Sequence, residues 1–125
     1  MNRTTLLIGL GGFLGSVGRY WVQQYVLRYF PVSFPLGTFV VNLAGCLLIG
    51  LLLGFFERAP GASASWRVFL TTGFCGGFTT FSTFAYESLT LARTGEVALL
   101  ALYTAGSVSL GLLAAFAGFS LARLM

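Results

Sequence analysis

The chain has 125 residues and a net charge of +4; 57% of the residues are hydrophobic and 8% are charged. Soluble domains carry about 25% charged residues, so a soluble fold is excluded, and the length leaves room for four membrane spans of about 20 residues each. Without histidine, lysine or aspartate, the chain lacks the usual residues of metal sites, acid–base catalysis and Ser-His-Asp triads, so we expect no enzyme.

The first predicted span covers about residues 4–27 and is rich in glycine. Four of its glycines recur every third residue, and one more lies four residues before another; they are Gly9, Gly11, Gly12, Gly15 and Gly18. Small residues on one face let a second helix approach closely, so this spacing predicts a packing face. Arg19 is close enough to the end of the span to snorkel to the membrane surface, but it could equally lend positive potential to a vestibule.

A second span is predicted over about residues 37–56, after a short loop that Pro31 and Pro35 mark, because proline resists helix continuation. The one strongly polar residue inside this span is Asn42. Polar residues buried in a span either bond neighbouring helices together or take part in function. The spacing alone leaves both interpretations of Asn42 open.

The third predicted span, about residues 66–91, has at its centre a run of glycine, threonine, serine and phenylalanine over residues 71–84. Paired glycines and β-branched threonines make a poor continuous helix, so the run predicts a helix break in the middle of the span. At membrane depth, irregular backbone survives only where protein or a water-filled path covers its polar groups. We therefore expect the break to line a pathway.

Helical spacing in this run predicts an aromatic stripe and a polar stripe. They are Phe78, Phe81 and Phe84 on one face, and Thr80, Thr83 and Glu87 on the other. An aromatic stripe often serves packing alone, but the adjoining break and the hydroxyl groups favour a functional role here. The electron-poor edges of phenylalanine rings can stabilise an anion, and neutral donors can replace its water without binding it too tightly for conduction. The residues alone thus predict a membrane pathway of neutral donors without catalytic groups.

The fourth predicted span covers about residues 97–121. Within it, Tyr103 and Ser107 are four residues apart and share a helix face. Hydroxyl groups in helices commonly bond to their own backbone, so the residues are consistent either with that local bonding or with a polar lining.

Four spans would place both termini and the middle loop on one side of the membrane. The seven arginines are then Arg3, Arg58, Arg67 and Arg123 on that side, and Arg19, Arg28 and Arg93 on the other. The positive-inside rule sets orientation by such an imbalance, and four against three is almost none. We therefore expect insertion in both directions and an antiparallel homodimer with its two-fold axis in the membrane plane. The positive charge needs no nucleic acid to explain it.

Each of the first three spans contains one glycine-containing motif. The three motifs are Gly12-x-x-Gly15-x-x-Gly18-Arg19-Tyr20, Gly37-Thr38-x-x-x-Asn42-x-x-Gly45 and Gly73-Phe74-x-Gly76-Gly77-x-Thr79-Thr80-Phe81-Ser82-Thr83-Phe84. The chain resembles the CrcB family, the bacterial Fluc fluoride channels, over all four spans, and the third motif is specific. The resemblance implies an all-α integral membrane protein of four transmembrane helices, the third one broken, which forms an antiparallel dual-topology homodimer with two pores in the bacterial inner membrane.

The resemblance also implies roles for individual residues. Phe81 and Phe84 would be the pore phenylalanines, contributed across the dimer, and Asn42 would be the pore-lining amide. The other residues that it marks are Ser82, Thr83, Tyr103 and Ser107 for the polar pore, Arg19 and Glu87 for the vestibule, and the backbone carbonyls of Gly76 and Thr79 for a structural sodium ion on the two-fold axis. The implied function is passive, selective export of cytoplasmic fluoride, which confers fluoride resistance.

Two rival functions require different residues. A small multidrug-resistance transporter needs a membrane-embedded carboxylate in its first span, and residues 4–27 contain none. A non-transporting assembly subunit would explain the glycines, but not the hydroxyls and phenylalanines clustered beside a helix break. The sequence therefore favours the fluoride channel.

Overall fold

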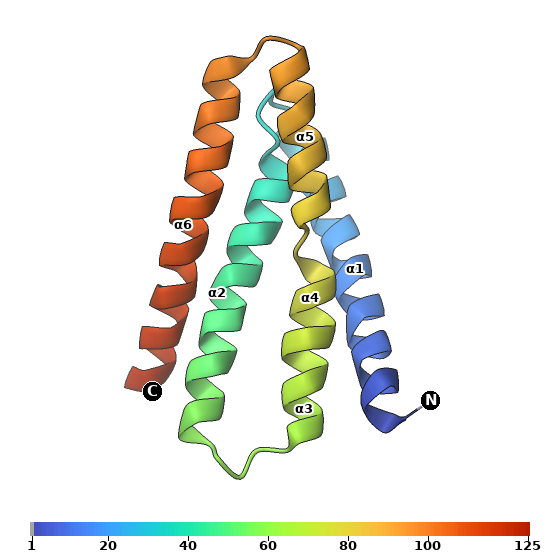
Figure 1. Cartoon of the computed structure of the whole chain (residues 1–125), viewed down its shortest axis with the longest axis vertical. Coiled ribbons are helices and arrows are strands. Elements are labelled where there is room, and N and C mark those ends of the chain that lie inside the picture. Colours follow the sequence, from blue (N-terminus) through green and yellow to red (C-terminus); the bar gives the residue numbers. More distant parts are fainter. Residues whose placement is uncertain (1) are drawn as a thin grey trace.

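The structure is a computed structural model that describes residues 2–125, and every regular element within this range is a helix (Figure 1). The three long helices are α1 (Arg3–Tyr29), α2 (Leu36–Arg58) and α6 (Val97–Leu124). Between α2 and α6 lie α3 (Ala64–Val68), the π-helical η1 (Phe69–Cys75), α4 (Gly76–Phe78) and α5 (Phe81–Arg93). The chain ends and the α2–α3 connection lie at the lower end of the bundle in Figure 1. The all-helical class that the composition predicts is confirmed.

The ends of the helices have local causes. Asn2 begins α1, because its side-chain oxygen accepts the Thr5 N–H at 2.8 Å and so satisfies a donor that has no partner within the helix. Pro35 immediately precedes α2. Its lack of a backbone N–H costs no hydrogen bond there, because the N–H groups at the start of a helix have no partner within the helix. Gly95, with φ of +79°, turns the chain between α5 and α6 in a conformation that favours glycine.

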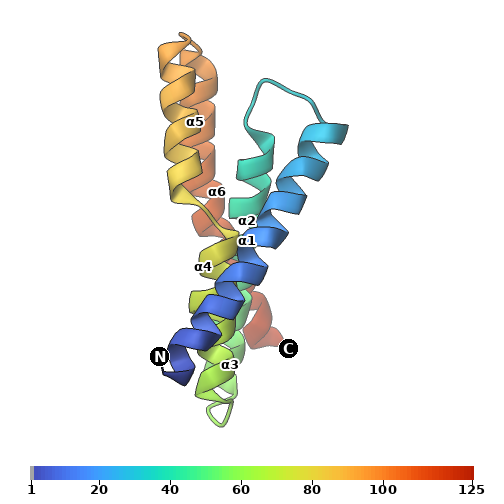
Figure 2. The same ribbon diagram turned by 90° about the vertical axis from the view of Figure 1, so that its right-hand side faces the viewer.

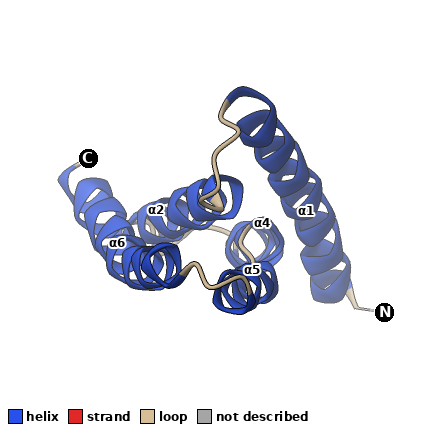
Figure 3. Ribbon diagram, turned by 90° about the horizontal axis from the view of Figure 1, so that it is seen from above, coloured by secondary structure: helices blue, strands red, loops and turns tan. Residues whose placement is uncertain are grey.

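Helices α2 and α6 lie side by side along most of their length (Figures 1 and 3). Glycine makes this approach possible. A Cβ atom at Gly50 of α2 would overlap the carbonyl oxygen of Ala115, and one at Gly118 of α6 would overlap the carbonyl oxygen of Leu47. In lipid, such backbone proximity stabilises a helix pair through van der Waals contact, since apolar burial gives no advantage there.

A second glycine contact joins α1 to the interrupted segment. A Cβ at Gly11 would lie 2.9 Å from the Cα of Gly73, and one at Gly15 would overlap the carbonyl oxygen of Phe74. By contrast, nothing lies within 4 Å of the Cβ position at Gly9. Gly12 also belongs to this contact, because a Cβ at Gly77 would overlap the Gly12 carbonyl oxygen. The predicted packing face is therefore confirmed for Gly11, Gly12 and Gly15, and Gly9 lies outside it.

These two contacts place the interrupted segment inside the bundle. Seen from above, α4 and α5 lie between α1 and the α2–α6 pair (Figure 3). The side view shows the upper part of α1 leaning away from α5, while the lower part of α1 crosses α4 (Figure 2). The segment around residues 76–81 thus lies at mid-height, with neighbouring helices against part of its surface.

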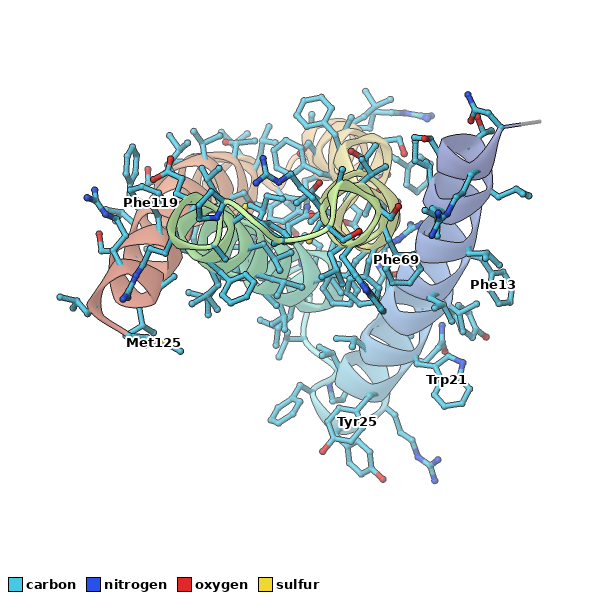
Figure 4. The ribbon with its side chains drawn as sticks, turned by 90° about the horizontal axis from the view of Figure 1, so that it is seen from below. Phe13, Trp21, Tyr25, Phe69, Phe119 and Met125 are labelled. Carbon is cyan, nitrogen blue, oxygen red and sulfur yellow. The ribbon has the colours of Figure 1, made fainter. Side chains whose placement is uncertain are left out.

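The outer surface of the bundle is apolar. On α1, Phe13, Trp21 and Tyr25 point away from the other helices (Figure 4) and are 65%, 70% and 60% exposed. Helices α2 and α6 are long and apolar enough to cross a membrane. The backbone hydrogen bonds of a helix are made within the helix, so helices with apolar surfaces suit a lipid environment. The fold is therefore that of a helical membrane protein.

Arginines close two helix ends at the lower end of the bundle. Arg58 donates from Nη1 to the carbonyls of Ala122 at 3.3 Å and Arg123 at 3.1 Å, in the last turn of α6. Arg67 donates to the carbonyl of Phe56 at 3.4 Å, and its guanidinium carbon lies 5.1 Å from the centre of that ring. The last carbonyls of a helix lack internal partners and favour a nearby cation, so both side chains stabilise the ends they contact.

Replacing Gly118 with alanine is expected to destabilise the protein by about 1–3 kcal/mol, because the methyl group would overlap the Leu47 carbonyl. The matched change on the same helix is Gly106→Ala, whose Cβ would lie in ordinary contact, 3.6 Å from the Phe39 ring. Thermal unfolding of both variants in detergent measures the difference. Equal unfolding midpoints would contradict the packing described for α2 and α6.

Candidate functional site

The third helical segment is interrupted at Thr79 and Thr80, within the run 71–84 (Figure 1). Both residues are extended: Thr79 has φ −80° and ψ 158°, and Thr80 has φ −148° and ψ 117°. Thr80 also caps α5, because its Oγ1 accepts the N–H of Thr83 at 3.2 Å. Two β-branched hydroxyl residues in succession thus end one helix and begin the next.

Asn42 of α2 satisfies both backbone groups of Thr80. Its Nδ2 donates to the Thr80 carbonyl at 3.0 Å, and its Oδ1 accepts the Thr80 N–H at 2.8 Å. One amide therefore replaces two hydrogen bonds that a continuous helix would have supplied. Of the two interpretations that the sequence leaves open, the structure gives direct geometry for helix–helix bonding, and a part in function stays a prediction.

The interruption changes the partners of the carbonyls that precede it. In an α-helix each carbonyl accepts the N–H four residues on, but the N–H of Thr80 is taken by Asn42 and that of Thr83 by the Thr80 hydroxyl. The carbonyls of Gly76 and Thr79 therefore do not receive these N–H groups. Beside Gly76 the chain also leaves open space, since nothing lies within 4 Å of its Cβ position.

Arg19 of α1 binds a third carbonyl of the interruption. Its Nε donates to the carbonyl of Gly77 at 3.1 Å, and the Ser16 hydroxyl donates to the same oxygen at 3.4 Å. Gly77 is near the C-terminal end of the helical stretch 64–78, where a positive charge is favourable. Arg19 thus contacts the break itself, which neither the snorkelling nor the vestibule interpretation of the sequence included.

The rings near the break form a row that differs from the predicted stripe. Phe81 and Phe84 have ring centres 5.5 Å apart, and Phe84 lies 5.0 Å from Tyr103 of α6. Phe78, however, precedes the interruption and stacks on Phe74 at 5.7 Å. The prediction that Phe78, Phe81 and Phe84 form one stripe is wrong for Phe78, because the extended residues reset the helical phase between 78 and 81.

A cleft of about 470 Å³ lies beside the break. Six of the residues that the resemblance marks line it together: Asn42, Gly76, Thr79, Phe81, Phe84 and Ser107. The Ser107 hydroxyl is buried and has no hydrogen-bond partner among residues 2–125. The Phe81 ring is 80% exposed, so the cleft is bordered by a large aromatic surface that this chain does not cover. The cleft offers neutral polar groups and aromatic rings, and the lining residues within the described range 2–125 include no charged side chain.

The other marked residues lie outside this lining: Arg19, Ser82, Thr83, Glu87 and Tyr103. Glu87 and Thr83 instead line a second cavity, of about 320 Å³, between α1, α2 and α5. There the two carboxylate oxygens of Glu87 accept hydrogen bonds from Thr38 at 2.8 Å and from Tyr103 at 2.6 Å. Glu87 is thus bonded within the bundle, whereas the resemblance assigns it to a vestibule.

Thr38 and Gln23 belong to this second site and were missed by the sequence reasoning as site residues. The Gln23 amide donates to the Thr38 hydroxyl at 3.1 Å. A usable signal was present, because polar side chains inside a span are costly and commonly functional. Gln23 lies in the first span, and Thr38 is the second residue of the second motif.

Comparison with known proteins matches the family described as CrcB-like protein, Camphor Resistance (CrcB), over residues 6–119. A relative from Flavobacterium psychrophilum, named fluoride-specific ion channel FluC, is 44% identical over 97% of this chain and 98% of its own. Relatives of the same name from Nitratidesulfovibrio vulgaris and Chlorobium luteolum are each 48% identical over 96% of this chain, and over 97% and 92% of their own. The chain therefore belongs to the CrcB-like family.

Proposed function

We propose that the chain is a fluoride-selective passive channel that exports cytoplasmic fluoride across the bacterial inner membrane and so confers fluoride resistance. The observation that carries the proposal is the similarity over nearly the whole chain to bacterial relatives named fluoride-specific ion channels. Their name describes channels, which favours transport over enzymatic activity. The small multidrug-resistance alternative requires a carboxylate in the first span, and α1 has none.

The chemistry of the cleft supports an anion pathway. Asn42 uses one amide hydrogen on the Thr80 carbonyl, which leaves its second hydrogen free to donate. The hydroxyl of Ser107 also has no hydrogen-bond partner among residues 2–125. Together with the edges of Phe81 and Phe84, these donors could replace part of the water around fluoride, and they carry no charge that would trap the ion. Ser82, Thr83 and Tyr103 extend the proposed polar path beyond the cleft.

We further propose that two copies pair in antiparallel orientation and form two pores. Three features support a second copy: the 80% exposure of Phe81, the open cleft and the free space beside Gly76. The near-equal distribution of the seven arginines supports opposite orientations of the two copies. In this arrangement the Phe81 ring of each chain completes the pathway of its partner.

A structural sodium ion fits the same interface. The carbonyls of Gly76 and Thr79 do not receive the N–H groups four residues on, and a two-fold axis beside them would bring together four such oxygens. The carbonyls that end half-helices coordinate Na⁺ in other broken-helix membrane proteins. A group of three or more histidine, cysteine or acidic side chains suited to a metal is absent from residues 2–125, so backbone oxygens are the donors to consider. The ion would hold the two copies together.

The direct test is ion efflux from liposomes that contain the purified protein, with fluoride and chloride followed by ion-selective electrodes. Fast fluoride release with negligible chloride release is the expected result. Release of both anions at similar rates would contradict selectivity. Release of neither from folded, dimeric protein would favour the non-transporting assembly subunit.

Replacing Phe81 with isoleucine is expected to lower fluoride efflux roughly tenfold or more while leaving assembly intact, because the aliphatic side chain has no electropositive edge. Phe13→Ile is the matched control, since this ring is similarly exposed but lies on the outer face of α1. Efflux rates at equal protein density measure the effect. Unchanged efflux in Phe81→Ile would show that the ring edge has no part in conduction.

Replacing Gly76 with leucine is expected to abolish the dimer without unfolding the chain. Within one chain the new side chain meets open space, but it would occupy the volume proposed for the ion and the second copy. Gly61→Leu, in the α2–α3 connection, also meets open space and serves as the control. Cross-linking in detergent, with and without sodium, measures the dimer. A stable Gly76→Leu dimer would exclude this placement of the sodium ion.

A further inference from the structure

Four helices meet in a hydrogen-bonded cluster separate from the cleft. Its members are Gln23 of α1, Thr38 of α2, Glu87 of α5 and Tyr103 of α6. None of the four lines the 470 Å³ cleft. Thr38 and Tyr103 are 2% and 0% exposed, so both side chains are shielded from solvent.

The directions of these hydrogen bonds follow from the number of protons available. Gln23 Nε2 donates to Thr38 Oγ1 at 3.1 Å, and a hydroxyl that accepts in this way still has one proton to donate. That proton goes to Glu87 Oε1 at 2.8 Å, and the Tyr103 proton goes to Oε2 at 2.6 Å. Successive bonds of this kind polarise and strengthen one another in a buried setting. Gln23 therefore determines where the Thr38 proton points.

The cluster is connected to the cleft through the Tyr103 ring. This ring lies 5.0 Å from Phe84, a lining residue of the cleft, and 5.4 Å from Phe34 in an edge arrangement. Because the Tyr103 hydroxyl is bonded to Glu87, the position of the carboxylate sets the position of the ring. A continuous chain of contacts thus runs from Gln23 on α1 to Phe84 at the pathway.

We propose that Gln23 is a positioning residue for fluoride conduction. It holds the Thr38 hydroxyl on Glu87, and through Glu87 and Tyr103 it fixes the ring of Phe84 beside the cleft. Gln23 does not touch the cleft and acts only through Thr38. The inference rests on the proposed function, because its measured quantity is fluoride flux.

The neighbouring residue provides a matched control. Gln24 lines the same 320 Å³ cavity as Gln23, but its side chain makes no hydrogen bond to residues 2–125. Gln23→Met and Gln24→Met therefore make the same chemical change in the same cavity, and only the first removes a donor from the cluster.

The experiment measures fluoride efflux from liposomes against fluoride concentration for the wild type, Gln23→Met, Gln24→Met, Thr38→Val and the double variant Gln23→Met/Thr38→Val. Gln23→Met is expected to raise the half-saturating fluoride concentration roughly fivefold, the effect of one lost hydrogen bond. Thr38→Val should raise it at least as much, and the double variant should match Thr38→Val, because a residue that acts only through Thr38 adds nothing once Thr38 is changed. Gln24→Met should behave as the wild type.

Three results would overturn the inference: equal half-saturating concentrations for Gln23→Met and Gln24→Met, a fall in maximal flux alone, or additive effects in the double variant. A fall in maximal flux alone would indicate fewer folded channels. If Gln23→Met does not fold, the half-saturating fluoride concentration is measured for Gln23→Glu instead. A carboxylate at position 23 accepts the proton of the Thr38 hydroxyl, so Thr38 no longer donates it to Glu87. A roughly fivefold rise of the half-saturating concentration in Gln23→Glu supports the inference, and a value equal to that of the wild type refutes it. Absent fluoride flux in the wild type would instead refute the proposed function.

Discussion

The backbone at Thr79 and Thr80 leaves the helix at mid-height in the bundle, and Thr80 is only 8% exposed there. An unpaired N–H or carbonyl there is costly, so other segments must supply partners. Asn42 binds both backbone groups of Thr80, and Arg19 binds the carbonyl of Gly77. The carbonyls of Gly76 and Thr79 do not receive the N–H groups four residues further along. The break and the side chains that satisfy it form one unit.

Close helix packing is what brings these side chains within reach. Helix α1 approaches the interrupted segment through Gly11 and Gly15, which places Arg19, four residues further along, at the break. Helix α2 approaches it through Gly45, where a Cβ would overlap the Thr79 methyl group, and Asn42 lies three residues before that contact. A larger side chain at any of these glycines would separate the helices and leave backbone groups without partners. The glycines therefore support the site by keeping the helices close enough for these hydrogen bonds to form.

The bundle keeps its polar groups in two environments of different character. The cleft contains neutral groups. Two of its donors, the second Asn42 hydrogen and the Ser107 hydroxyl, have no partner in the part of the chain that the structure describes. The carboxylate of Glu87 lies outside that lining and receives two hydroxyl protons. A negative charge in the cleft would repel an anion, and an arginine there would hold it. Glu87 and Arg19 both lie outside the lining of the cleft, so the cleft itself presents neutral groups.

The sequence by itself determined the membrane class, the all-helical architecture and the place where the third helix weakens. Those properties follow from composition and local backbone preference, as in the run Gly76-Gly77-Phe78-Thr79-Thr80. It also marked Asn42 as the one strongly polar residue of its span, and its motifs identified the family. Only the tertiary structure decided which partners these residues bind. The extended pair at 79–80 moved Phe78 out of the aromatic row, the close approach of α1 placed Arg19 on Gly77, and the meeting of four helices assigned Glu87 to Thr38 and Tyr103. Helical periodicity could not predict these contacts, because it describes one continuous helix, and each of them depends on a break in that helix or on the distance between helices.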